Sequence, residues 1–152
     1  MRLPRFRSLP STLFALSALV TVLWAPTHAA EPALHYRVDD PALTWVACPP
    51  FMPKGCGLAV LHGDPGKPNV DVFFRIPAKA EIPSHWHTSA ERMMLVEGVM
   101  QVEYNGQAPL TLRPGGYAYG PAKAPHRGVC LSASPCILMI AFEAPLDAHP
   151  IP

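Results

Sequence analysis

Twenty prolines and ten glycines interrupt this chain of 152 residues, and they leave no long helical period beyond its first thirty residues. Proline is excluded from helix interiors, and glycine weakens them. Between these breaks lie eight short runs of strand-forming residues, at 43–47, 58–62, 70–76, 93–97, 100–104, 110–112, 117–119 and 137–142. Short strands with turns at this spacing predict an all-β fold, either an antiparallel barrel or a double-sheet jelly roll.

Residues 1–29 have the pattern of a secretory signal peptide. Three arginines precede an apolar run of 12 residues, and Thr27 and Ala29 occupy the −3 and −1 positions of a cleavage site. An uncleaved membrane anchor is the alternative, although the run is short for a membrane span. We therefore expect an exported protein, periplasmic or secreted, in which residues 30–152 form a single domain.

The charge of the chain argues against two kinds of partner. The whole chain has 12 basic and 11 acidic side chains, but the predicted leader holds three arginines and no acid. Without the leader the chain is acidic by two charges, so no basic stripe remains for nucleic acid or for an anionic membrane surface. We expect a small-molecule substrate or ligand, and no membrane contact after cleavage.

Four cysteines follow the leader: Cys48, Cys56, Cys130 and Cys136. An even number in an exported chain indicates two disulfides, and four cysteines permit three pairings. The local pairs are favoured, because Cys130 and Cys136 flank a turn sequence and Cys48 and Cys56 enclose a proline-rich loop. The alternative is a thiolate metal site, which neither spacing favours.

His85, His87 and Glu91 place two imidazoles and a carboxylate within seven residues. Side chains alternate across a strand, so the two histidines share a face if this segment is extended. Glu91 follows after a gap that lets the chain return its carboxylate to the same point, and His126 is the candidate for a fourth ligand. Such a set suits one divalent transition metal, Fe, Mn, Cu, Ni or Zn.

The spacing of these residues resembles the two sequence motifs of the cupin superfamily, G-x5-H-x-H-x3,4-E-x6-G and G-x5-P-x-G-x2-H-x3-N. The matching residues are His85, His87, Glu91 and Gly98 in the first motif and Gly115, Pro121 and His126 in the second. Two motifs in order are far more specific than a lone H-x-H. The resemblance covers residues 69–142 and implies a small single-domain cupin, an antiparallel double-stranded β-helix whose metal ligands are the three histidines and the glutamate.

Three positions depart from the motifs. Lys79 and Lys123 stand where the family has glycine, so the backbone there must avoid positive φ or tolerate some strain. Cys130 replaces the asparagine that ends the second motif, where a disulfide to Cys136 could support the strand instead. None of the departures removes a metal ligand.

The resemblance implies a metal-dependent enzyme, and we predict a dioxygenase that acts on a small oxygenated or aromatic compound. Glu91 could leave the metal and act as a base, which is what resemblance to flavonol-cleaving cupins implies. Isomerase or lyase chemistry would use the same four residues, and a non-catalytic metal- or ligand-binding module is the alternative from another class. Because cupins commonly pair through their outer strands, the resemblance also implies a homodimer.

Three further residues are candidates for substrate binding. Arg75 could clamp a substrate carboxylate or enolate if its face of the strand at 70–76 is interior, and an exposed strand arginine is the alternative. Tyr117 and Tyr119 share a face and could orient a substrate or donate a proton, or could fill the barrel. The tail at 147–152 is expected to be loose.

Overall fold

The computed structural model describes residues 30–152, of which residues 33–152 form one compact unit. The predicted signal peptide, residues 1–29, lies outside the described residues. Every regular element from residue 30 onward is a β-strand, and that part of the chain has no apolar helix of membrane-spanning length.

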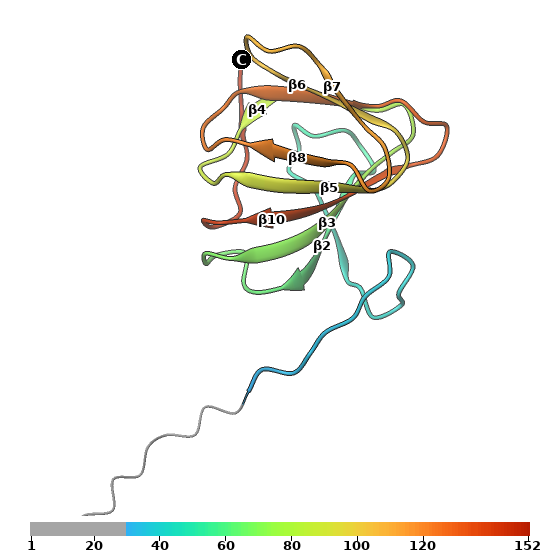
Figure 1. The fold of residues 1–152 in the computed structure, drawn as a ribbon, viewed down its shortest axis with the longest axis vertical. Coiled ribbons are helices and arrows are strands. Elements are labelled where there is room, and N and C mark those ends of the chain that lie inside the picture. Colours follow the sequence, from blue (N-terminus) through green and yellow to red (C-terminus); the bar gives the residue numbers. More distant parts are fainter. Residues whose placement is uncertain (1–29) are drawn as a thin grey trace, which may run out of the picture. The chain divides into compact units, whose positions relative to one another are not determined.

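Two antiparallel sheets make up residues 33–152, and Figure 1 shows β2, β3, β10, β5 and β8 side by side in one of them. The six-stranded sheet has the order β1 (Trp45–Ala47), β2 (Gly57–His62), β3 (Val70–Ile76), β10 (Cys136–Phe142), β5 (Glu91–Glu97) and β8 (Tyr117–Gly120). The five-stranded sheet has the order β11 (His149–Pro150), β4 (Glu81–Trp86), β9 (His126–Cys130), β6 (Met100–Tyr104) and β7 (Leu110–Leu112).

The core lies between the sheets, because alternate residues of each strand point to the same side. In β3, Val70, Val72 and Ile76 are fully buried, and they pack in one cluster with Met100 and Val102 of β6 in the other sheet. Apolar side chains that two sheets direct toward each other supply the main stabilising term of such a fold. The prediction of an all-β, antiparallel jelly-roll barrel is confirmed.

All eight predicted runs are strands, and β4, β9 and β11 are the strands that the sequence pattern did not reveal. β4 contains Pro83 and Ser84, and β9 contains Gly128, residues that strands disfavour. The pairing of β4 with β9 is irregular between Ile82 and His85, so the segment containing the proline leaves the regular ladder.

The C-terminal tail is not loose, which corrects the expectation for residues 147–152. His149 and Pro150 form β11 and pair with Trp86 and His85 of β4. The backbone N–H of Ile151 donates a hydrogen bond to the Ser84 carbonyl at 3.0 Å. The missed signal was weak, because two paired residues carry no detectable alternation.

Lys79 and Lys123 both adopt positive φ, at 61° and 60°. The backbone therefore keeps the conformation that glycine would favour and tolerates the strain of a side chain. Both turns are tied down: the Lys79 ammonium donates to the Leu131 carbonyl, and the Lys123 N–H donates to the His87 carbonyl at 2.8 Å.

Both local disulfides form, Cys48–Cys56 and Cys130–Cys136, each with a Cα–Cα distance of 5.7 Å. No cysteine is free in the described part of the chain, so the alternative of a thiolate metal site is wrong. Cys130 ends β9 and Cys136 begins β10, so this disulfide links the two sheets.

Replacing Cys130 and Cys136 together by alanine is expected to lower the free energy of unfolding by about 2–3 kcal/mol, because a short closed loop is released in the unfolded chain. The urea midpoint measured by circular dichroism gives the change. Adding reductant to the wild type provides the comparison, and a midpoint shift near zero in the double variant would contradict the prediction.

Candidate metal centre

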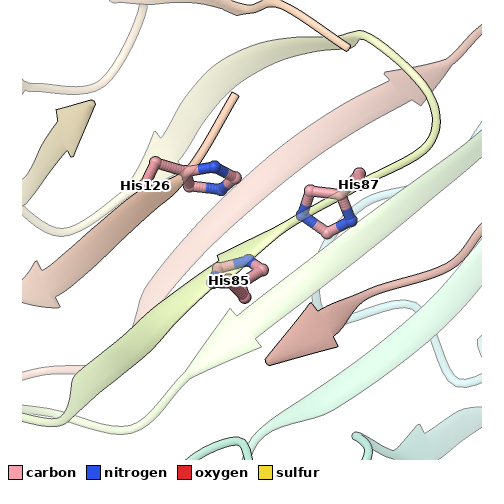
Figure 2. Close-up of side chains that lie close together, drawn as sticks. All are labelled: His85, His87 and His126. Carbon is pink, nitrogen blue, oxygen red and sulfur yellow. The ribbon is translucent and has the colours of Figure 1, made fainter. Parts of the chain in front are cut away.

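Three buried histidines meet between the sheets, as Figure 2 shows for the rings of His85, His87 and His126. His85 lies near the end of β4, His87 follows that strand, and His126 begins β9. His85 and His126 are direct partners in the antiparallel pairing of these strands. One ligand atom from each histidine lies within 4.8 Å of the others, so the three form a group able to hold a metal ion.

Each of the three rings is oriented by a backbone carbonyl. The Nδ1–H of His85 donates to Pro83 at 2.8 Å, that of His126 donates to Ala124 at 3.0 Å, and that of His87 donates to Asp147. A carbonyl oxygen can only accept, so the proton must sit on Nδ1 in each ring. All three Nε2 lone pairs are therefore free to bind a metal.

The C-terminal segment supplies the partner of His87. The Asp147 carboxylate accepts a hydrogen bond from the Thr88 N–H at 2.8 Å and also contacts His149 Nε2 at 3.1 Å. His149 in turn stacks on Trp86, with ring centroids 4.1 Å apart, so Trp86 faces away from the two ligand candidates beside it. Asp147 is thereby held where its carbonyl can fix the His87 ring.

Glu91 brings its carboxylate to the same place from the other sheet. It begins β5 and is only 4% exposed. Its Oε1 lies 3.3 Å from His87 Nε2, and its Oε2 lies 3.5 Å from His126 Nε2. His87 Nε2 is nevertheless buried without a hydrogen-bond partner, which a bound cation would supply. The four predicted ligands are thus brought together, and their donor set fits a divalent transition metal.

Burial sets the protonation of all four side chains. The pKa of His85 is lowered to about 3, that of His126 to about 4, and that of His87 is also lowered. In all three rings the largest cause is loss of solvation. The imidazoles are therefore neutral near pH 7, as metal ligation requires. The same loss of solvation raises the pKa of Glu91 to about 8, so this carboxyl keeps its proton near neutral pH until a cation arrives.

Tyr104 is a neighbour of the site that our sequence analysis missed. Its ring centroid lies 5.0 Å from that of His126, and its hydroxyl is buried without a hydrogen-bond partner. Burial, followed by the charge of Glu91, raises the pKa of Tyr104, so the hydroxyl remains a proton donor. The signal was present in the alternation of Met100, Val102 and Tyr104 along β6, which places all three on the inner face.

A cavity of about 180 Å³ reaches the four ligand candidates. The rest of its wall is mainly apolar and includes Met52, Leu58, Phe74, Ile82, Met100 and Leu138. Met52 belongs to the loop closed by the Cys48–Cys56 disulfide, and Phe51 of the same loop lies 6.1 Å from the His85 ring between centroids. The cavity therefore joins a polar cluster to an apolar wall, part of which a disulfide holds in place.

The three residues predicted to bind substrate do not line this cavity. Arg75 lies on the outer face of its sheet with its guanidinium 4.1 Å above the Trp45 ring. Tyr117 and Tyr119 are 58% and 51% exposed, so they do not fill the barrel either. Arg75 is thus the outer-face strand arginine of the alternative, whereas neither expectation for the two tyrosines holds, because the inner positions of β3 and β8 are Phe74 and Ala118, one residue away in each case.

The affinity for zinc is expected to rise about tenfold per pH unit from pH 6.5 to 8 and then to level off. Metal binding must displace one proton from Glu91 below its pKa of about 8, whereas the histidines, with lowered pKa values, release none in that range. Competition titrations with a chelator measure the slope. Glu91→Gln should bind more weakly and without this slope, while the exposed His35→Ala should retain it; equal slopes in both variants would contradict the assignment.

Gly120→Ala is expected to weaken metal binding by about tenfold or more, because a ligand's supporting groups would be displaced. A Cβ there would overlap the Tyr104 hydroxyl and lie 3.1 Å from Glu91 Oε2. Gly66→Ala is the matched control, since its Cβ would come no closer than 3.4 Å to the Asp64 carboxylate. Dissociation constants for both variants test the prediction, which fails if Gly120→Ala binds metal like the control.

Comparison with known proteins identifies the architecture. No curated protein sequence matches the chain. A chain from the crystal structures of the DMSP lyases RdDddP and RnDddQII is similar with a TM-score of 0.64 and 19% identity, over 72% of this chain and 63% of that one. The chain thus spans less than two thirds of the length of that relative, and identity at this level shows the fold alone.

Two further structures share the fold over larger parts of their own length. The polyketide cyclase RemF from Streptomyces resistomycificus is 19% identical with a TM-score of 0.61, over 78% of this chain and 86% of that one. An RmlC-like cupin from Shewanella frigidimarina NCIMB 400 is 24% identical with a TM-score of 0.52, over 60% and 78%. The family model for the cupin domain matches residues 72–142, which include all four ligand candidates, and the chain is a member of the cupin superfamily.

Proposed function

We propose that this protein is an exported, metal-dependent dioxygenase that acts on a small oxygenated or aromatic compound. The observation that carries the proposal is the convergence of three neutral imidazoles and one carboxylate on an apolar cavity. His85, His87, Glu91 and His126 would hold one divalent metal, Fe, Mn, Cu, Ni or Zn. When bound, such an ion supplies Lewis acidity to a substrate oxygen and, where it is redox-active, chemistry toward dioxygen.

The residues of the chain divide the remaining work. The carbonyls of Pro83, Ala124 and Asp147 hold the three rings in the tautomer that presents Nε2. The apolar wall excludes water and orients a substrate toward the polar cluster. Glu91 is a candidate base, because a bound cation would displace its proton, and a carboxylate that then left the metal could accept a proton from the substrate in an interior that favours the protonated carboxyl.

Two other functions use the same residues. Isomerase or lyase chemistry would use the same metal to make a bound substrate more acidic and the same base to take up its proton. The fold is also shared with DMSP lyases and a polyketide cyclase. A non-catalytic binding module would be favoured by a closed site, whereas a cavity that reaches the ligand cluster favours an enzyme.

Export and pairing complete the proposal. Two disulfides are typical of oxidising compartments, which supports a periplasmic or secreted location. A homodimer through outer strands is supported by exposed apolar side chains on β5 and β8, namely Met94, Tyr117 and Tyr119. Light scattering of the purified protein would determine its oligomeric state.

Metal analysis of protein recovered from its native compartment, followed by oxygen uptake with diketones, flavonols and phenols, tests the proposed function. One equivalent of metal and oxygen uptake with at least one compound are expected. His126→Ala should lose the metal and His35→Ala should keep it; full occupancy in His126→Ala would show the four-ligand assignment to be wrong. Substrate conversion without oxygen consumption would show that the protein is an isomerase or lyase and not a dioxygenase.

A further inference from the structure

We infer that the cavity takes a neutral compound of about one ring in size, whose only ionisable oxygens are those that bind the metal. A ligand with a carboxylate, sulfonate or phosphate elsewhere in its structure is excluded. The inference rests on the proposed function, because the charge of the bound metal determines how much negative charge a ligand can carry. It goes further by specifying the charge and the size of the ligand.

The wall of the cavity offers no cation to a ligand. Among residues 30–152, Arg127 is the one lysine or arginine at the cavity, and its guanidinium donates to Glu103 at 2.7 and 3.1 Å with the side chain 64% exposed. Arg127 thus contributes its backbone, because it alternates with the inward-pointing His126 in β9. An ionised group on a buried ligand would have no partner, which is strongly unfavourable.

The acids at the cavity reinforce this selection. Glu91 is at the metal centre, and Asp147 lies at the wall with its carboxylate engaged by Thr88 and His149. A divalent ion together with ionised Glu91 carries a net charge of about +1. One enolate or phenolate oxygen on the metal cancels that charge, so a second negative group on the ligand would be uncompensated in a poorly polarisable interior.

Size supplies the second limit. A cavity of about 150 Å³ in another protein accommodates benzene, and the cavity here has about 180 Å³. A single ring with a few substituents, or an aliphatic chelator of the same bulk, fits within this space, whereas a flavonol with three rings would have to extend beyond it. The Cys48–Cys56 disulfide restrains the loop that contributes Pro49 and Met52, which limits expansion on that side.

A matched ligand pair tests the charge rule. Zinc-loaded protein, with its metal content measured first, is titrated calorimetrically at pH 7.5 with 3,4-dihydroxybenzamide and 3,4-dihydroxybenzoate, which share one chelating group and one shape. We expect the neutral amide to bind at least about a hundredfold more tightly than the acid. Catechol should bind with an affinity similar to that of the amide, and the flavonol quercetin should bind much more weakly than catechol.

Each other outcome counts against the inference. Equal or tighter binding of the acid would overturn the charge rule, and tight binding of quercetin would overturn the size limit. Zinc-loaded protein that binds none of the single-ring compounds would overturn the inference and leave the metal assignment standing. Protein that takes up no metal would overturn the proposed function together with the inference.

A variant pair locates the effect in the cavity. Met52→Lys places a cation at the wall and should shift the ratio of acid to amide affinity at least about tenfold toward the acid. Leu34→Lys adds the same charge at a side chain that is 51% exposed and does not line the cavity, and it should leave the ratio unchanged. An unchanged ratio in Met52→Lys, or equal shifts in both variants, would overturn the cavity as the binding place.

Discussion

The Nδ1–H groups of His85, His87 and His126 donate to backbone carbonyls, and the rest of the centre depends on these three bonds. They fix the tautomer, and the tautomer decides which nitrogen faces the interior. Two of the carbonyls lie only two residues before their histidines, so the local chain path orients those rings. The third comes from Asp147, which makes the C-terminal segment part of the site.

The interior of this barrel carries very little charge without an ion. Loss of solvation keeps the imidazoles neutral and Glu91 protonated, and it leaves the Tyr104 hydroxyl without a partner. A cation would reverse this preference at Glu91, because its attraction for a carboxylate offsets the lost solvation. The same low polarity that tunes the ligands also limits which compounds can share the cavity with them. Ligand selection and ligand protonation thus have one physical cause.

Sequence patterns predicted the fold class, both disulfides and the group of four polar side chains. Strands such as β3 and β6 were evident because they are runs of strand-forming residues, whereas β4 and β9 carry Pro83 and Gly128 and owe their extended state to pairing with each other. Spacing found His85, His87 and Glu91, but the face of an isolated strand has no absolute direction in a sequence. The sequence therefore left both faces open for Arg75, and Tyr104 was overlooked despite its regular position.

The hydrogen bond between His87 and Asp147 also determines when the site can form during synthesis of the chain. A ribosome delivers His85, His87 and Glu91 some sixty residues before the carbonyl that orients the middle one. The nascent chain therefore cannot complete its ligand geometry until Asp147 has emerged. If the chain is translocated unfolded, that moment falls on the far side of the membrane, where the ions of the receiving compartment would be the first to meet a finished site.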